Sequence, residues 1–239
     1  MRFHIGTTIV AAVIGFSIST AAAQVCDRSL TVGFEPPWPP FQFNENGQKK
    51  GIDHDILIEV GKRTKCQMKF KEMPWKRQLR GAKSGDVDIV PAANKTDERD
   101  KYAKWTVSYL PYAAVLWVDS DDRNKYENIK EFLDSGKTVG KIRGTTIGEE
   151  ADNLLRQEKY KEQLKENKST LLNIRMISAG RIDGLVDNSM TVGYLAKQEG
   201  MRKVIRRTET VVLSDPLHLL LSEKTVTNEM VQGFNAALN

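Results

Sequence analysis

The sequence is poor in the residues that bind metal ions and in long apolar runs. It has two Cys and three His in 239 residues, and one of these, His4, lies in the N-terminal segment treated below. The remaining Cys and His have no metal-ligand spacing, so we expect neither a metal ion nor a cofactor. After the first residues no stretch of about 18 apolar residues occurs, which predicts a folded chain without a membrane-spanning helix.

Charge of one sign is not concentrated in any part of the sequence. Lys and Arg number 36 and Asp and Glu number 31, giving a formal net charge of +5, and both signs are mixed along the chain. A nucleic-acid-binding protein is expected to carry a basic block or stripe. We therefore expect no nucleic-acid partner, and we interpret the mixed charge as a soluble surface.

The first residues have the composition of a secretory signal peptide. A basic start precedes residues 5–18, an apolar stretch too short to span a bilayer, and Ala21–Ala23 follows. A charged start, a short apolar region and an Ala-x-Ala site predict a signal peptide at residues 1–23. The alternative, a membrane anchor, would need a longer apolar stretch. We therefore expect residues 24–239 to be exported to the periplasm.

The two cysteines are expected to form a disulfide. Cys26 precedes the strand-like segment Leu30–Gly33, and Cys66 precedes Met68–Phe70. If these segments are neighbouring parallel strands, their starting ends lie side by side and a bridge can close. An even number of Cys in an exported chain favours this bridge over two free thiols.

Strands and helices alternate along the sequence, which predicts an α/β fold with mostly parallel sheets. A first helix is expected to be capped by Asp53, with Leu57 and Val60 on its apolar face and basic residues at its end. The other early elements are expected at Leu30–Phe34 (strand), Met68–Lys71 (strand), Lys76–Lys83 (helix) and Val87–Val90 (strand).

The same pattern occurs twice along the chain. Thr31–Gly33 has a counterpart in Thr138–Gly140, and Ser84–Val90 has one in Ala179–Val186. In the longer pair a helix ends at Gly, which readily takes the left-handed cap conformation, and a short apolar strand follows. Two matches in the same order predict two similar α/β lobes.

Two apolar strands are expected to connect the lobes. Tyr112–Val118 precedes the second lobe and Leu217–Leu221 follows it, and a crossing pair of strands is a natural hinge. Thr225–Leu238 is expected to be a closing helix that packs on the first lobe. The predicted divisions are residues 24–113 for lobe 1, 114–216 for lobe 2, and 217–239 for the return strand and closing helix.

Four segments follow strands at the edge of the sheet where open parallel sheets bind ligands. These are Glu35–Phe41, Pro91–Arg99, Arg143–Thr146 and Asp187–Asn188. Arg99 offers a planar fork of donors that suits a carboxylate, and backbone N–H groups after Gly144 favour the same group. Asp187 suits an ammonium group. Trp38 and Trp75 are placed to sandwich the apolar part of a ligand.

Each of these residues also has a structural interpretation. Trp38 is equally suited to filling core space, and Arg99 to a surface ion pair with an acid on its own helix. Thr146 with Glu149 fits a capping box, and Asp187 fits a helix cap. The functional interpretation is favoured because all four segments fall at the same kind of position on two facing lobes. Leaving Arg99 and Asp187 unpaired in a dry cleft would cost several kcal/mol per ion, and a zwitterion pairs with both.

A set of short motifs extends over nearly all of residues 24–239. They are Leu30–Gly33 with Pro40–Phe41, Gly51–Asp53, Gly85–Asp88, Lys95–Arg99, Tyr109 with Tyr112, Gly140 with Gly144–Thr146, and Gly180–Asp183. In these motifs the sequence resembles the bacterial extracellular solute-binding proteins of family 3, the periplasmic polar amino-acid-binding components of ABC transporters.

The resemblance implies a two-lobed periplasmic binding protein fold of type II, in which two crossing hinge strands let the lobes close around a ligand. It implies that Arg99, helped by Thr146, holds an α-carboxylate and that Asp187 holds an α-ammonium group. The ligand-binding residues predicted in this way are Glu35, Trp38, Trp75 (or Pro74), Asn94, Arg99, Thr145, Thr146 and Asp187.

The function expected from the resemblance is that of a monomeric, non-enzymatic carrier. It would close on a small zwitterion, most simply a polar amino acid or a related small carboxylate, and deliver it to the membrane permease of an ABC transporter. Two departures bear on the ligand, because Pro91–Ala93 and Ile147 stand where the family usually has hydrogen-bonding side chains. Relative to the family the chain also ends early, at Asn239, so we expect further turns beyond it.

Two alternatives to the carrier stay open at this point. One is an enzyme on the same fold, resembling periplasmic cyclohexadienyl dehydratases, in which Glu35 would be the general acid. The other is a sensor lobe that signals through a partner, although the sequence carries no signalling domain.

Overall fold

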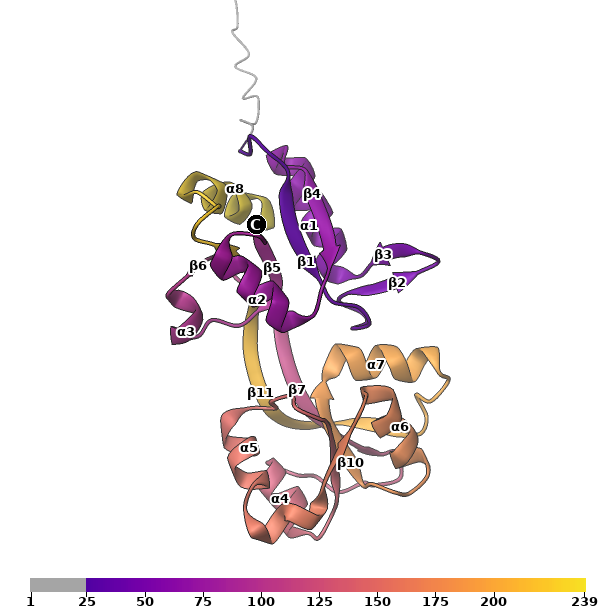
Figure 1. The fold of residues 1–239 in the computed structure, drawn as a ribbon. Coiled ribbons are helices and arrows are strands. Elements are labelled where there is room, and N and C mark those ends of the chain that lie inside the picture. Colours follow the sequence, from indigo (N-terminus) through magenta and orange to yellow (C-terminus); the bar gives the residue numbers. More distant parts are fainter. Residues whose placement is uncertain (1–24) are drawn as a thin grey trace, which may run out of the picture.

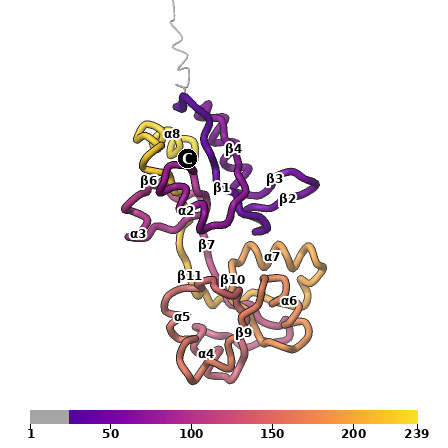
Figure 2. Tube along the Cα trace, viewed as in Figure 1, coloured from indigo at the N-terminus to yellow at the C-terminus, as the bar shows by residue number. Residues whose placement is uncertain are grey.

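The structure is a computed structural model that describes residues 25–239, so the predicted signal peptide lies outside the described residues. Two lobes are joined by two long strands, β7 (Leu110–Asp119) and β11 (Ile205–Ser222), which run side by side (Figure 1). The chain returns along β11 to lobe 1, where the C-terminal helix lies near the first strand (Figure 2). This arrangement confirms the predicted two-lobed fold with crossing hinge strands.

Lobe 1 contains a parallel set of strands with helices packed around it. Its elements are β1 (Leu30–Phe34), β2 (Phe43–Glu45), β3 (Gln48–Lys50), α1 (Ile52–Thr64), β4 (Met68–Glu72), α2 (Trp75–Ser84), β5 (Ile89–Ala93), α3 (Asp97–Asp100), β6 (Ala103–Trp105) and α8 (Asn228–Leu238). Strand β1 pairs in parallel with β4 and β5. The core of lobe 1 joins β1 and α1 to β11 and α8 through buried apolar side chains, among them Leu57, Leu219 and Phe234. Burial of each such side chain contributes about 1.5–3 kcal/mol.

Lobe 2 repeats the same design with fewer strands. Its elements are α4 (Ile129–Asp134), β8 (Val139–Ile142), α5 (Glu149–Leu155), a 3₁₀ helix (Glu158–Gln163), β9 (Leu164–Asn167), α6 (Thr170–Ser178), β10 (Gly184–Asn188) and α7 (Ser189–Gln198). Strand β8 pairs in parallel with β9 and β10. Strand β10 pairs antiparallel with β7, so one sheet continues through the hinge in the order β4-β1-β5-β11-β7-β10-β8-β9.

The predicted disulfide is confirmed. Strands β1 and β4 are parallel neighbours, with Leu30 opposite Met68, so the segments that precede them start side by side. Cys26 and Cys66 are bonded, with their Cα atoms 5.1 Å apart. The bridge ties the start of β1 to the end of α1 in the core of lobe 1.

Two helix starts differ from the sequence prediction by more than one residue. Helix α1 begins after Gly51, whose φ is 124°, and Asp53 is a buried residue of its first turn rather than its cap. The closing helix α8 begins at Asn228, later than expected, because the Thr227 side chain accepts the N–H of Met230 and caps the helix there. Both differences arise where a tertiary or capping contact overrides the apolar pattern.

A hairpin in lobe 1 was not expected from the sequence. Strands β2 and β3 pair antiparallel around Asn46 and Gly47, which have φ values of 50° and 75°. Asn-Gly is the dipeptide favoured in two-residue hairpin turns that need positive φ at both positions. The hairpin extends from lobe 1 toward α7 of lobe 2 (Figure 1).

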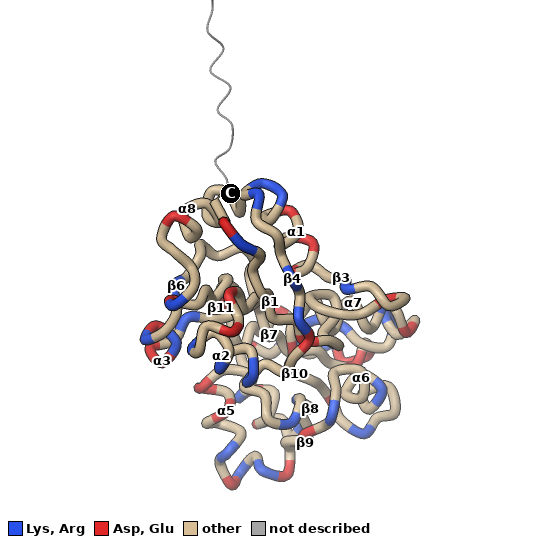
Figure 3. Tube along the Cα trace, turned by 45° about the horizontal axis from the view of Figure 1, so that its top comes forward, with Lys and Arg blue, Asp and Glu red and all other residues tan. Residues whose placement is uncertain are grey.

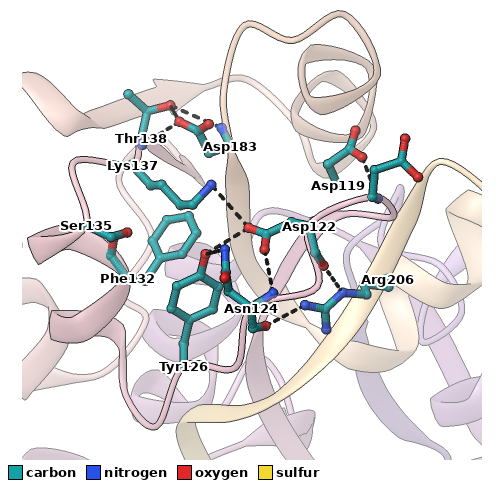
Figure 4. Close-up of polar contacts among 11 residues, drawn as sticks. Asp119, Asp122, Asn124, Tyr126, Phe132, Ser135, Lys137, Thr138, Asp183 and Arg206 are labelled. Carbon is teal, nitrogen blue, oxygen red and sulfur yellow. Dashed lines mark hydrogen bonds and ion pairs between the residues drawn. The ribbon is translucent and has the colours of Figure 1, made fainter.

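A polar cluster holds the connection between β7 and α4 in lobe 2 (Figure 4). Asp122 accepts hydrogen bonds from the Tyr126 hydroxyl at 2.8 Å and from the Asn124 N–H at 2.9 Å, and Lys137 lies 3.2 Å from it. Arg206 of β11 donates to the backbone carbonyls of Asp122 and Asn124. Since Lys137 precedes β8, this cluster lies near the amino end of that strand, away from the edge expected to bind a ligand.

Charged residues of both signs are distributed along the chain in both lobes (Figure 3). Helix α2 carries a denser basic group, with Lys76, Arg77, Arg80 and Lys83 on ten residues and no acid. Among the residues described, none of the helices combines the length and apolarity needed to span a bilayer.

Candidate functional site

On lobe 1 the structure brings together Trp75, Asn94 and Arg99. Trp75 is the first residue of α2, and Asn94 directly follows β5. Arg99 Nη1 donates to the backbone carbonyl of Asn94 at 2.7 Å, and Arg99 Cζ lies 5.3 Å from the centroid of the Trp75 ring. The short helix α3 is capped by Thr96, whose side chain accepts the N–H of Arg99 at 3.3 Å. These contacts fix the guanidinium beside the end of β5.

The ion pair considered for Arg99 is not formed. Within residues 25–239 no acidic side chain lies within ion-pair distance of its guanidinium, although Asp97, Glu98 and Asp100 are on the same helix. Arg99 is only partly exposed. A guanidinium that is oriented by an aromatic ring and a carbonyl, but not neutralised, is suited to bind an anion.

On lobe 2 a carboxyl group lies at the end of β10. Asp187 accepts hydrogen bonds from the Thr170 hydroxyl and from the N–H of Asn188, the latter at 2.7 Å. Burial raises the pKa of Asp187, and these two hydrogen bonds offset only part of the effect. Burial and the nearby Asp187 also raise the pKa of Tyr112. No cation of the described chain pairs with Asp187.

Asp187 is not the cap of the following helix. That role belongs to Asn188, whose side chain accepts the N–H groups of Met190 and Thr191 at 2.9 and 3.1 Å. The structural interpretation of Asp187 is therefore wrong. Its carboxyl group is left partly buried and without a counter-ion, which makes it an acceptor for an added cation.

The two threonines after β8 use their hydroxyl groups within lobe 2. Thr145 donates to the carbonyl of Ile142 at 2.8 Å, and Thr146 donates to Asp152 at 2.5 Å. Helix α5 begins after Gly148 without a side-chain cap, so the capping box of Thr146 with Glu149 is not formed. Both threonines are exposed, and their hydroxyl oxygens keep acceptor rather than donor capacity.

The loop after β1 carries the last two predicted residues. Glu35 is placed by its backbone, whose N–H donates to Gln42 Oε1 at 2.7 Å. The Trp38 ring stacks on Phe41, with ring centroids 4.4 Å apart and planes 22° apart. No ring contact joins Trp38 to Trp75 in the described part of the chain. The two tryptophans therefore occupy separate positions, one after β1 and one at the start of α2.

The comparisons with known proteins agree with this architecture. Residues 30–238 match the family of bacterial extracellular solute-binding proteins, family 3. The chain belongs to this family. The solute-binding protein is 27% identical over 213 residues to the L-cystine-binding protein TcyA of Bacillus subtilis (strain 168), a match that covers 87% of this chain and 74% of TcyA.

Two further similarities extend the comparison. The solute-binding protein is 31% identical over 140 residues to the histidine-binding periplasmic protein of Escherichia coli (strain K12), with 56% of this chain and 51% of that protein covered. Among solved structures, the arginine-, lysine-, histidine-binding protein ArtJ from Geobacillus stearothermophilus superposes with a TM-score of 0.67 and 21% identity, covering 88% of each chain. The structural likeness supports the fold of the solute-binding protein.

Sequence reasoning missed Asp215, which lies in β11 beside the site. Asn94 Nδ2 donates to Asp215 Oδ2 at 2.7 Å, and Asp215 is opposite Tyr112 across the hinge. A cavity of about 380 Å³ is lined by the hinge residues Ser108–Tyr112 and Ser214–Pro216. In sequence Asp215 is a lone acid before a proline, and only the pairing of β11 with β5 and β7 places it there.

Contacts between the lobes were also missed. Phe43 of β2 lies near Tyr194 of α7, with ring centroids 5.8 Å apart. Met190 in the first turn of α7 packs against a lobe 1 cluster that includes Phe41 and Leu217. The signal for this interface was the Asn46–Gly47 turn, which marks the hairpin carrying Phe43.

The predicted ligand residues of the solute-binding protein thus form a group on each lobe. Trp75, Asn94 and Arg99 are joined on lobe 1, and Asp187 is near Tyr112 on the lobe 2 side; no described contact joins Arg99 directly to Asp187. Between residues 25 and 239 no group of three or more His, Cys, Asp or Glu side chains could hold a metal ion. The side chains of Arg99, Asn94 and Asp187 supply groups for ion pairing and hydrogen bonding.

Proposed function

We propose that this chain is the periplasmic solute-binding component of an ABC importer, and that its lobes close on a small zwitterion such as a polar amino acid. Family membership and the two-lobed fold support solute binding. The relatives named for L-cystine and histidine support an amino acid as the ligand class. A monomer that delivers its ligand to a membrane permease fits this role.

One observation carries the proposal. Arg99 on lobe 1 and Asp187 on lobe 2 each lack an oppositely charged partner in the described chain. Arg99 follows strand β5, and Asp187 lies at the carboxyl end of strand β10. An α-amino acid supplies the two missing charges on one small molecule. Its α-carboxylate would pair with Arg99 and its α-ammonium group with Asp187, and closure that dries the cleft would strengthen both contacts.

The hinge supports a closing movement around such a ligand. Asn94, whose carbonyl orients Arg99, is hydrogen-bonded to Asp215 of β11. The pairing of β11 with β7 shows register shifts between Arg207 and Leu213, which are irregularities of the kind that permit strands to bend. The lobe 1 anchor is thus connected to a strand whose irregular pairing would allow it to bend in the proposed closure.

The test is a thermal-shift screen of the 20 standard amino acids, L-cystine and related small acids with the purified chain from residue 24 onward. A ligand at about 100 times its Kd should add about 2.7 kcal/mol of stability. Arg99→Ala should remove this shift and leave the melting temperature of the unliganded protein unchanged. Arg181→Ala, at an exposed arginine whose side chain has no described partner, is the matched control and should keep the shift.

Two outcomes would count against the proposal. Absence of a shift with every compound would remove the ligand class, and unfolding of unliganded Arg99→Ala would make Arg99 structural. The enzymatic alternative is tested by incubation with prephenate and arogenate. We expect both to be recovered unchanged, and a decarboxylated aromatic product would replace the carrier assignment with a dehydratase.

A further inference from the structure

A buried acid in lobe 1 has no role in the contacts described for the ligand. Asp53, in the first turn of α1, is 1% exposed. Its Oδ1 accepts a hydrogen bond from the Tyr109 hydroxyl at 2.6 Å, and its Oδ2 accepts one from Gln42 Nε2 at 2.7 Å. Because both oxygens act as acceptors, the geometry is that of an ionised carboxylate.

Each partner of Asp53 continues to a segment that carries predicted ligand-binding residues. Gln42 Oε1 accepts the backbone N–H of Glu35 at 2.7 Å. The Tyr109 hydroxyl accepts the backbone N–H of Ala92 at 2.9 Å. Asp53 therefore links the loop after β1 to the end of β5, although these segments are far apart in the sequence. We call Asp53, Gln42, Tyr109 and the two N–H groups the Asp53 network.

The backbone at Ala92 makes this link consequential. Its φ is 54°, in the left-handed region that residues with a Cβ atom rarely adopt. Two residues later Asn94 offers its carbonyl oxygen to Arg99 Nη1 at 2.7 Å. The Tyr109 hydroxyl thus holds an unfavourable backbone conformation two residues before the carbonyl that orients the guanidinium.

We propose that Asp53 is a positioning residue for the ligand site, and that tight ligand binding requires its carboxyl group to be ionised. This inference rests on the proposed function. Protonation turns one carboxyl oxygen into a donor that faces either Gln42 Nε2 or the Tyr109 hydroxyl. In the first case the hydrogen bond is lost, and in the second it reverses and leaves the Tyr109 hydrogen without this acceptor, so either way one donor of the network is unsatisfied. The contact that holds the loop of Glu35 or the end of β5 is then weakened, and the ligand site becomes less ordered.

The protonation of Asp53 is expected near pH 6. Burial raises the pKa of Asp53 to about 6, against the lowering effect of the hydrogen bonds from Tyr109 and Gln42. Burial raises the pKa of the Tyr109 hydroxyl well above its usual range, so Tyr109 remains a donor throughout. Asp53 is therefore the member of the network whose charge changes near neutral pH.

No charged side chain of the described chain contacts the carboxyl group of Asp53, whose partners are Gln42 and Tyr109. Next to Asp53 on α1, His54 and Asp55 pair with each other at 3.0 Å. On β3, which packs against α1, Lys49 pairs with Glu72 of β4, and Lys50 makes no described contact with Asp53. Strand β5 contributes only the N–H of Ala92 to the network. No charged neighbour contributes to the raised pKa of Asp53.

The test measures Kd by isothermal titration calorimetry from about pH 5 to about pH 8. The probe is the amino acid with the largest thermal shift in the screen, excluding histidine, whose side chain titrates in this range. For the wild type we expect Kd to rise as the pH falls below about 6, approaching about tenfold per pH unit, because one proton competes with binding. Asp53→Asn copies the protonated form and should bind more weakly at about pH 8 without this pH dependence. Asp187 is present in both proteins, so its own titration cancels in the comparison.

A second variant keeps the test decisive if Asp53→Asn does not fold. Tyr109→Phe removes one hydrogen bond to the carboxylate and should move the midpoint of the pH profile to higher pH. Tyr102→Phe, a tyrosine outside the network, should leave the midpoint in place. A flat wild-type profile, an unchanged profile in Asp53→Asn, or an unmoved midpoint in Tyr109→Phe overturns the inference and leaves the proposed function standing. Failure of every amino acid to bind overturns the proposed function instead, and this inference with it.

Discussion

The guanidinium of Arg99 lies over the ring of Trp75, with Arg99 Cζ 5.3 Å from the ring centroid. Stacking on an aromatic face restricts the rotation of a planar guanidinium and leaves its N–H groups available at the edge. Trp75 begins α2 and Arg99 follows β5, so the orientation of the anchor depends on the packing of two elements. The ring of Trp75 and the carbonyl of Asn94 together orient a guanidinium that has no acidic partner in the described chain.

The carboxyl group of Asp187 should stabilise the complex with ligand and destabilise the unliganded protein. Since burial raises its pKa in the folded state, its contribution to stability is greatest below its unfolded pKa and declines as the pH rises through the folded value. Asp187→Asn should therefore raise the melting temperature of the unliganded protein at about pH 7 and abolish the ligand-induced shift. Differential scanning calorimetry with and without ligand measures both effects. Asp121→Asn, an exposed acid, is the control, and a lower melting temperature in Asp187→Asn would refute the prediction.

The polar cluster around Asp122 should have the opposite pH dependence and no effect on binding. Burial raises the pKa of Asp122, but hydrogen bonds from Asn124, Tyr126 and Lys137 outweigh it and lower the pKa overall. The contribution of Asp122 to the free energy of unfolding is present above its pKa in the unfolded chain. It is lost as the pH falls through its pKa in the folded protein. Asp122→Asn should cost about 1–3 kcal/mol at about pH 7, with a smaller difference from wild type in acid, and leave Kd unchanged. Urea unfolding at several pH values measures the first effect; a weakened Kd would show that this cluster reaches the ligand site.

The disulfide should stabilise lobe 1 without taking part in binding. Cys26 and Cys66 are 40 residues apart in sequence, and closing a loop of that length contributes about 4 kcal/mol in the chain-entropy description. The double variant Cys26→Ser, Cys66→Ser should therefore unfold at lower denaturant concentration, and the wild type should behave in the same way once reduced. Ligand affinity below the unfolding transition should be retained. Equal stability of oxidised and reduced wild type would contradict this.

The contact of Phe43 with Tyr194 should favour the closed arrangement of the lobes. An aromatic pair contributes about 0.5–1.5 kcal/mol beyond burial, so Phe43→Ala should weaken ligand affinity by about 2-fold to about 10-fold. Neither residue is predicted to touch the ligand, so the loss should be similar for different amino acids. Small-angle X-ray scattering should show a larger radius of gyration for the unliganded variant. A change of ligand preference instead of a uniform loss would mean that the hairpin reaches into the site.

Sequence patterns predicted those parts of the fold that depend on local apolar runs. Strand β1 was expected at its observed bounds, and the parallel pairing of β1 with β4 gave the Cys26–Cys66 bridge. Strand β5 extends beyond the predicted Val90 to Ala93, through Pro91, because it pairs with β11. That extension comes from a strand more than 100 residues later, which no local pattern contains.

The sequence named candidate site residues, but it did not predict their hydrogen bonds. The positions of Arg99 and Asp187 follow from strand ends and from the family resemblance, and their roles stay predictions until a ligand is bound. The partners of Thr146 and Asn94 were not predictable, because Asp152 and Asp215 approach them only through tertiary packing. The β2–β3 hairpin was missed because it lacks an apolar alternation, although its Asn46–Gly47 turn was visible.

The central claim, that Arg99 and Asp187 hold the two charges of one ligand, is tested most directly with ligand analogues. For the best-binding amino acid we would measure the Kd of the parent, of the amine without its α-carboxylate, and of the acid without its α-ammonium group. Each analogue should lose at least about 2 kcal/mol, or about 30-fold in Kd, with the wild type. In Arg99→Ala the parent and the amine should bind within about threefold of each other, since the carboxylate has no anchor left to lose. If Arg99→Ala prefers the parent over the amine as strongly as the wild type does, the carboxylate is held elsewhere and the claim is wrong.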